Sequence, residues 1–435
     1  MKIGLTELVL ILLIGALTVG PSVALWVDKW MRRAQRSSAA AARRRAAQRA
    51  QAAAERQAVL KRFQKLSIVF AVFAVIALVW ALVLRPIEAE PKAYTAPDAA
   101  DTVRQSTAGY NTIETAGYKS ISCIRQSGDW VYLSAQQKSS GFSRKTTSAL
   151  LRMQPDGSGL SAILTVEGEI TGFDLDADGN IWYTLAAVDG GALCRASYDG
   201  WGAASEQIVT QIDGKNLSSP TAVVIGADGK VYFANAAAAS ASNGEVAALR
   251  TELMAHTATG AVYVYDPASR NVQQVLGCIA GASGLAISAD GTELYVSDMG
   301  SRCVWAVSCA GRELTAGGKN CDALLTALPG YPSSLAVDDD GVLYIGYMWA
   351  QSNWLEGNAS GTLLRGAALR LSSTMQENLF SLSASDIAAE SFDINTGTLV
   401  GYTGKNLGSV AAICPAGTRL YFGTVDAADL KWAGV

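Results

Sequence analysis

The chain is poor in the residues that usually build metal and nucleophile sites. It contains one histidine, His256, and none of its seven cysteines forms a Cys-x-x-Cys pair, which excludes zinc sites of the Cys/His type. All the cysteines lie beyond residue 115, widely spaced. We expect buried thiols and at most one disulfide, for which Cys309 and Cys321, on either side of a Gly-rich loop, are the favoured pair.

Positive charge is scarce outside one segment. The net charge is −3, yet residues 28–66 hold twelve Lys/Arg against only Asp28 and Glu55, so the remainder is clearly acidic. A chain that binds nucleic acid along its length would not show this asymmetry. We therefore expect no nucleic-acid partner.

Two long apolar runs stand on either side of the basic segment. Residues 5–27 are broken only by Glu7 and by Gly20-Pro21, and residues 67–84 form a run of eighteen without a charge. At about 1.5 Å per residue, eighteen residues are just sufficient for a hydrocarbon core of about 30 Å. A signal peptide is the alternative for the first run, but only Lys2 precedes it and no small-x-small site follows. We predict transmembrane helices over 1–27 and 67–84, in contact with membrane lipids through 5–27 and 67–84.

The basic segment between them, 28–66, contains no Gly or Pro and is rich in Ala, Arg and Gln, which favours helix. Positive charge is retained on the cytoplasmic side, so we expect a cytoplasmic helix whose basic residues, 29–65, contact anionic headgroups. The protein would then be a multi-pass cell-membrane protein with both ends outside the cytoplasm. Residues 85–117, with three prolines, are interpreted as a linker that keeps the next domain off the bilayer.

A repeated hairpin indicates the fold of residues 118–435. Each copy has a turn that contains Gly, usually Asp-Gly, followed by an apolar strand with a central tyrosine. Asp-Gly supplies the positive φ angles of a tight hairpin. Six such units of short strands predict an all-β, six-bladed β-propeller, placed after a two-helix transmembrane hairpin. A pair of β-sandwiches is the alternative, but it gives no reason for one hairpin to recur. The tyrosines are Tyr132, Tyr183, Tyr232, Tyr295, Tyr344 and Tyr421.

The first forty residues carry a short resemblance. Residues 5–12, LTELVLIL, are followed by Gly20-Pro21 and a basic stretch. This order resembles the small subunits of the twin-arginine translocase, in which a spanning helix bends at Gly-Pro into a surface helix. The chain departs from that family in Val19 and Ser22, where an aromatic residue and a lysine are usual. The resemblance supports an outward N-terminus.

The strands from about 118 to 430 resemble a second family, the strictosidine-synthase-like propellers related to gluconolactonases. The stretches that carry the resemblance are TGAVYVYDP (259–267), ASGLAISADG (282–291), LYVSD (294–298), LPGYP (328–332) and LYFGT (420–424). The resemblance implies a six-bladed propeller with a divalent cation, such as calcium, at the mouth of its channel. Such a cation is held by oxygen ligands.

At the positions that the resemblance makes important, this chain has other residues. Ser283 stands where the family has a ligand Asn, Ser333 where it has a ligand Asp, and Gly408 in the region of a last-blade catalytic Glu. A serine hydroxyl is neutral and cannot replace a carboxylate. We expect no catalytic residue, no metal and no cofactor, and a protein that is not an enzyme, although its enzymatic status stays open.

The remaining site candidates are sought at the channel mouth or in a groove. Glu169 precedes a strand, Asp298 follows one, and Ser283 and Ser333 could still line a pocket. Trp349 and Trp354 could form a wall on which flat ligands stack, with packing between blades as an equal alternative. Lone His256, in an insertion before a strand, is interpreted as structural.

Three functions fit these observations. The first is a non-catalytic propeller that binds a protein or a carbohydrate outside the cytoplasm, as a binding or scaffold module. The second is a metal-dependent lactonase or esterase with a rearranged site. The third is an accessory component of a membrane translocation or transport assembly.

Overall fold

The computed structural model describes residues 39–98, 105–107, 109–115, 117–137, 146–198, 203–404, 407–427 and 429–435. Two compact units are present. The first comprises Met1–Ile87 with Gly366–Ser373, and the second comprises Glu88–Arg365 with Thr374–Val435. The predicted first transmembrane helix, 1–27, lies outside the described residues, and so does most of the translocase-like segment.

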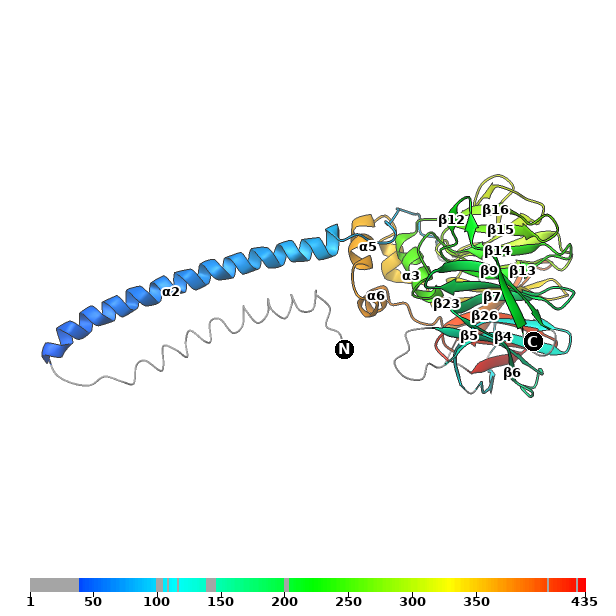
Figure 1. Ribbon diagram of the computed structural model, residues 1–435, viewed down its shortest axis with the longest axis horizontal. Helices are drawn as coiled ribbons and strands as arrows, with labels where there is room; N and C mark the ends of the chain where they lie inside the picture. The colour runs from blue at the N-terminus through cyan, green and yellow to red at the C-terminus, as the bar shows by residue number, and fades with distance from the viewer. Residues whose placement is uncertain are drawn as a thin grey trace. The chain divides into compact units, whose positions relative to one another are not determined.

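In the first unit, a continuous helix runs through residue 66, where we expected the basic helix to end and the second transmembrane helix to begin. α2 (Ala39–Val79) continues directly into the π-helical turn η1 (Trp80–Leu84), so the basic segment and the second apolar run share one rod (Figure 1). Within it, Gln48–Leu84 is long and apolar enough to cross a membrane. The composition explains the continuity, because neither Gly nor Pro occurs between Ala39 and Arg85. A hairpin of two spanning helices is not seen among the described residues.

The second unit is the expected six-bladed β-propeller. Blade 1 consists of β3 (Tyr118–Ser127), β4 (Trp130–Gln137), β5 (Thr147–Met153) and β6 (Ser161–Glu167). Blade 2 consists of β7 (Glu169–Leu175), β8 (Ile181–Ala187), β9 (Gly190–Tyr198) and β10 (Ala203–Val209). Blade 3 consists of β13 (Pro220–Ile225), β14 (Val231–Asn235), β15 (Gly260–Asp266), β16 (Asn271–Ile279) and the short β20 (Leu314–Thr315). The small hairpin β11 (Gln211–Ile212) and β12 (Lys215–Asn216) joins blades 2 and 3.

Blades 4 to 6 repeat the pattern. Blade 4 consists of β17 (Ala282–Ile287), β18 (Glu293–Asp298), β19 (Cys303–Ser308) and β21 (Asp322–Leu325). Blade 5 consists of β22 (Gly330–Val337), β23 (Val342–Ala350), β24 (Ile387–Asp393), β25 (Thr398–Thr403) and β1 (Gln105–Thr107). Blade 6 consists of β26 (Val410–Ala416), β27 (Arg419–Thr424), β28 (Leu430–Gly434) and β2 (Asn111–Ile113). The first strand of each blade lines the channel.

The propeller begins earlier in the chain than residue 118. β2 pairs antiparallel with β28 and closes the last blade, while β1 pairs in parallel with β25. Residues 85–117, expected to be a linker, therefore contribute two strands. Closure by an N-terminal strand ties the two ends of the repeat together and protects an exposed sheet edge.

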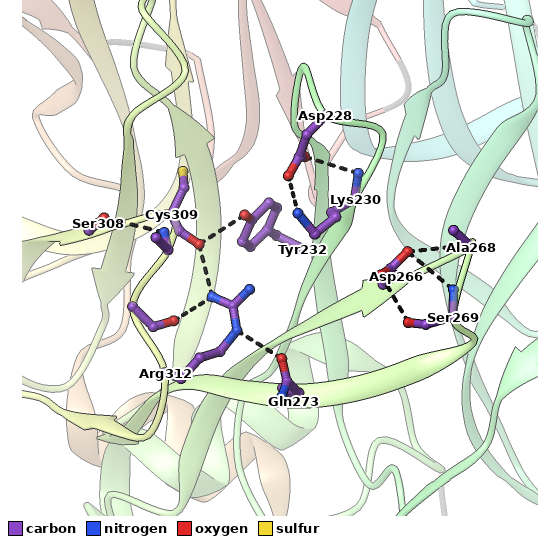
Figure 2. Close-up of polar contacts among 12 residues, drawn as sticks. Asp228, Lys230, Tyr232, Asp266, Ala268, Ser269, Gln273, Ser308, Cys309 and Arg312 are labelled. Carbon is purple, nitrogen blue, oxygen red and sulfur yellow. Dashed lines mark hydrogen bonds and ion pairs between the residues drawn. The ribbon is translucent and has the colours of Figure 1, made fainter.

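The repeated tyrosines lie where the hairpin pattern predicts, on the second strand of every blade. Turn chemistry explains the recurrence. In blade 3, Asp228 accepts a hydrogen bond from the Lys230 amide at 3.1 Å, and Gly229 takes the required positive φ of 76° (Figure 2). The Tyr232 hydroxyl then donates to the Cys309 carbonyl at 3.0 Å, which links blade 3 to blade 4.

Apolar packing between blades supplies most of the stability of this unit. Tyr232 and Val264 of blade 3 and Leu285 and Val296 of blade 4, for example, belong to one buried cluster. Burying one such side chain contributes roughly 1.5–3 kcal/mol relative to leaving it exposed. None of the seven cysteines joins this framework covalently, because all are free thiols, and the expected Cys309–Cys321 disulfide is wrong.

Helices cover one end of the blades. α3 (Glu245–Ala255) is inserted between β14 and β15, and α4 (Asn353–Gly357), α5 (Thr362–Leu369) and α6 (Ser373–Phe380) are inserted between β23 and β24. Each insertion follows the second strand of its blade. Because neighbouring strands are antiparallel, both insertions leave the blades at the end where the inner strands begin. We call this the capped end (Figure 1).

Candidate functional site

Hydroxyl side chains from five inner strands join successive blades around the channel. Each donates to the backbone carbonyl that precedes the equivalent residue of the next blade. The bonds are Ser122 Oγ to Ile170 O (2.7 Å), Thr171 Oγ1 to Pro220 O (2.8 Å), Thr221 Oγ1 to Ala282 O (2.7 Å), Ser283 Oγ to Pro332 O (2.8 Å) and Ser333 Oγ to Val410 O (2.5 Å). We call this series the hydroxyl ring. Buried hydroxyls need such partners, since an unpaired one is costly.

The sixth position of the hydroxyl ring is Ala411. It follows Val410, as Ser333 follows Pro332, and the equivalent acceptor would be the carbonyl of Ile121. Alanine has no donor, so the ring is open between blade 6 and blade 1.

The two serines at the family's ligand positions belong to this ring. Ser283 also exchanges a hydrogen bond with the Ser297 hydroxyl at 2.9 Å, and Ser333 lies 3.1 Å from the Gly346 carbonyl. Both side chains are buried, at 6% and 4% exposure. Their hydroxyl protons are committed to carbonyl or hydroxyl oxygens, and neither side chain carries charge.

Glu169 joins the capped end to the blades. It lies at the start of β7 and accepts a hydrogen bond from Gln136 Nε2 at 2.5 Å. Its other oxygen accepts from the backbone amide of Glu245, the first residue of α3, at 2.8 Å. A carboxylate at a helix N-terminus satisfies a free amide and the helix dipole. Glu169 therefore caps α3 from a neighbouring blade.

Glu245 points its own side chain into the channel. It lines the channel together with residues of all six inner strands, and only 7% of it is exposed. Its carboxyl group makes no hydrogen bond to any described residue. Burial, and then the nearby Glu169 carboxylate, raises the pKa of Glu245 well above its usual range. Burial also raises the pKa of Glu169. The composition of the insertion gave no sign of this pair, because Glu245 stands in an Ala-rich stretch without a motif.

Asp298, Trp349 and Trp354 lie away from the channel lining. Asp298 is buried at the end of β18, where it accepts from Trp305 Nε1 and the Ser301 amide, each at 3.1 Å. Trp349 is 5% exposed on β23, and Trp354 packs edge-on against Phe380 at 4.8 Å between ring centroids. Both tryptophans take part in packing, and the structure does not bring the three residues into one site with Glu169.

Gly408 lies in the turn before β26 with a positive φ of 95°. The neighbouring Ser409 amide donates to Asp426 Oδ2 at 2.8 Å. A Cβ at position 408 would lie 3.4 Å from that carboxylate oxygen, so this is a tight turn closed by Asp426. Its conformation accounts for glycine there.

Residues 88–98 lie along the capped end as a docked strap. The amides of Lys92 and Tyr94 donate to the carbonyls of Ala255 and Ala359, at 2.8 and 3.2 Å. The Tyr94 ring stacks on His256 at 3.8 Å, nearly parallel, and its hydroxyl donates to Leu355. The segment expected to be a free spacer thus forms part of the propeller unit.

Two fully buried arginines hold the strap. Arg365, on α5, donates to the carbonyls of Lys92 and Ala359 and lies over the Tyr94 ring at 5.1 Å. Arg302 donates to the Pro97 carbonyl at 2.8 Å and pairs with Glu356 at 3.3 Å. Arginine suits this role because its guanidinium offers five donors in a fixed plane.

His256 is buried in this contact, as its structural interpretation requires. Burial, and then the charge of Arg365, lowers the pKa of His256 to about 4. Its neighbour Glu252 accepts from the Thr257 hydroxyl and the Ala258 amide, and burial raises the pKa of Glu252 to about 7.

The fold and the channel define a capped six-bladed β-propeller. Over residues 184–372 the chain is similar to the family described as SMP-30/Gluconolactonase/LRE-like region. Over this part of the chain, the match confirms the expected resemblance to gluconolactonase-related propellers. A comparison with curated proteins gives no match.

Three solved structures are similar to this chain. A luciferin-regenerating enzyme is 15% identical, with 75% of this chain and 96% of that chain covered and a TM-score of 0.50. A gluconolactonase from Xanthomonas campestris is 17% identical, with coverages of 81% and 99% and a TM-score of 0.48. A calcium-binding regucalcin from Agrobacterium tumefaciens is 12% identical, with coverages of 77% and 96% and a TM-score of 0.48. At 15% identity, the likeness to the luciferin-regenerating enzyme concerns the fold alone.

The residues at the channel mouth do not fit the divalent cation that the resemblance to gluconolactonase-related propellers implies. Ser283 and Ser333 use their hydroxyls between blades, and Glu169 uses both carboxylate oxygens to hold Gln136 and α3. Among the described residues there is no group of three or more His, Cys, Asp or Glu side chains that could hold a metal ion. A hard cation prefers six or more converging oxygens.

Proposed function

We propose that this protein is a membrane-anchored, non-catalytic propeller that acts as a binding or scaffold module for an extracytoplasmic protein or carbohydrate. One observation carries the proposal. The channel mouth, where relatives of this fold would place a reactive centre, is built from neutral hydroxyls engaged between blades and is covered by α3, which Glu169 holds in place.

The α2–η1 helix supports the anchor. Its apolar part ends at Leu84, and large side chains such as Phe70, Phe73 and Ile76 are more than half exposed. A helix that shows apolar side chains all round is suited to lipid. The basic residues toward its N-terminal half favour the cytoplasmic side, which would place the propeller on the opposite side.

Hydrolysis assays on the full chain in detergent test the proposal. Lactone and aryl-ester substrates are offered with added calcium or zinc, before and after chelation. We expect no turnover that a chelator removes. Turnover that chelation abolishes and added cation restores would overturn the non-catalytic function.

A metal-dependent lactonase or esterase with a rearranged site is the second candidate. The family match over residues 184–372 favours it. Glu169 and Glu245 are the carboxyl groups that the structure brings together at the mouth, so Glu245→Gln is the informative variant. If the protein is a lactonase or esterase, Glu245→Gln should lose ester or lactone hydrolysis. If it is a non-catalytic module, neither the wild type nor the variant should hydrolyse these substrates.

A further inference from the structure

Exposed apolar side chains gather on two helices of the capped end. Outside α2 and η1, six large apolar side chains are exposed among the described residues, and four of them lie on α5 and α6. They are Leu363 (72% exposed), Leu364 (57%), Met375 (42%) and Leu379 (37%). We call these four the leucine patch. A cluster of this kind, in place of scattered single residues, marks an interaction surface.

The same helices turn other side chains inward. Arg365 of α5 and Phe380 of α6 are both fully buried. α5 and α6 therefore have an inner side that completes the cap. Their outer side carries the leucine patch together with exposed polar residues such as Glu377 and Asn378. Such helices can lie in the boundary between headgroups and acyl chains.

The C-terminal end of α5 is bonded to the residue that follows the apolar helix. Arg370, directly after α5, donates from Nε to the Arg85 carbonyl at 2.5 Å, and Arg85 Nη2 donates to the Arg370 carbonyl. Arg85 comes directly after Leu84, the last residue of η1. If η1 ends at the edge of the hydrocarbon core, both arginines lie at headgroup level. Their charge suits anionic headgroups there.

Chain length gives an independent limit. Only Arg85, Pro86 and Ile87 separate Leu84 from Glu88, which already accepts a hydrogen bond from the Ser240 amide of the propeller. Four residue steps reach at most about 14 Å. The strap, and the cap to which it is bonded, therefore stay close to the membrane surface whatever the orientation of the helix.

We propose that the leucine patch docks on the surface of the bilayer that the α2–η1 helix spans. The proposal rests on the membrane anchor of the proposed function. The tether makes docking intramolecular, so a modest apolar contact is sufficient. The capped end then faces the lipid, and the opposite end of the propeller is presented to a partner.

Lipid-borne quenchers test the docking on the full chain. Cys278, the exposed thiol, is replaced by serine, and a single cysteine that carries an environment-sensitive fluorophore is introduced at Leu379, Ala177 or Ala77. Ala177 is exposed in the β7–β8 turn, at the end opposite the cap, and Ala77 lies within α2. The protein is reconstituted in vesicles of phosphatidylcholine with a minor fraction of phosphatidylglycerol. The vesicles contain nitroxide lipids labelled near the headgroup or deep in the chain.

We expect the label at 379 to be quenched by the shallow nitroxide, the label at 77 by the deep one, and the label at 177 by neither. Leu363→Ser with Leu364→Ser should lower the quenching at 379 at least about twofold, because half of the apolar patch is removed. The matched change Val435→Ser, an exposed apolar residue at the end of β28, should leave it unchanged.

Quenching at 77 without quenching at 379 would overturn the docking and leave the anchor intact. Blue-shifted emission at 379 that no nitroxide lipid quenches would also overturn it, since a second copy or another protein would then cover the patch. Absence of quenching at 77 would overturn the anchor itself.

Discussion

The hydroxyl of Ser333 donates a hydrogen bond of 2.5 Å to the carbonyl of Val410, across the boundary between blades 5 and 6. Ser333, which the resemblance places at a cation-ligand position, thus joins two blades in this protein. Its four counterparts in the hydroxyl ring do the same between the preceding blades. The hydroxyl groups that line the channel therefore hold neighbouring blades together.

Ala411→Ser should stabilise the protein. The new hydroxyl completes the hydroxyl ring by donating to the Ile121 carbonyl, and a net gain of about 0.5–1.5 kcal/mol in the free energy of unfolding is typical of one such bond. Denaturant unfolding followed by circular dichroism measures it. Ala412→Ser is the matched control, because Ala412 is buried in an apolar cluster and its change should destabilise. Equal effects of the two changes would contradict the ring.

Glu245→Gln should weaken the pH dependence of stability. Because the folded protein raises the pKa of Glu245, it retains a proton that the unfolded chain releases above the ordinary value of 4.5. Stability from this group is therefore present at low pH and is lost as pH rises through the folded pKa. The variant should be more stable at neutral pH, by about 1–3 kcal/mol, since its neutral amide does not have to take up a proton when the chain folds.

Unfolding at several pH values checks this expectation. Glu252, whose pKa is raised to about 7, keeps a slope of the same sign in the variant. Exposed Glu206→Gln is the control and should leave the profile unchanged. A variant with the wild-type profile would show that Glu245 is solvated in the channel.

Tyr94→Ala should loosen the strap. The change removes the stack on His256 and the contact with Arg365, so the amides of residues 92 and 94 should exchange with deuterium faster. Tyr94→Phe keeps the ring and loses only the bond to Leu355, so its effect should be smaller. Hydrogen exchange read by mass spectrometry distinguishes the two. Wild-type exchange in Tyr94→Ala would mean that the arginines alone hold the strap.

Thiol titration should find one fast cysteine. Cys278 is exposed, Cys309 is partly buried and the other five are buried. Burial raises the pKa of Cys194 to about 11 and that of Cys414 to about 12, which keeps these thiols protonated and unreactive. Denatured protein, without reductant, should then titrate as seven thiols. Five thiols would indicate a disulfide.

The repeated turn and strand could be predicted from the sequence because the residues that form them are close together along the chain. Asp228, Gly229 and Tyr232 act within one hairpin, and the same chemistry recurs in other blades. The end of the continuous α2–η1 helix at Leu84 also has a local cause, because Pro86 follows and cannot continue a helix.

The contacts at the channel mouth could not be predicted from local sequence. Ser283 pairs with a carbonyl 49 residues away, and Glu169 meets an amide 76 residues away, so both contacts exist only once the blades are placed. The strap was missed for a similar reason. Its prolines indicated a spacer, whereas buried Arg365 and Arg302 bind its carbonyls from insertions far along the chain.

Calorimetric titration of calcium or zinc into the purified full chain tests the central claim most directly. The proposed non-catalytic propeller should show no stoichiometric binding, and Glu169→Gln should not change the heats. Binding of one ion per chain that Glu169→Gln abolishes would contradict the account and place a metal centre at the mouth.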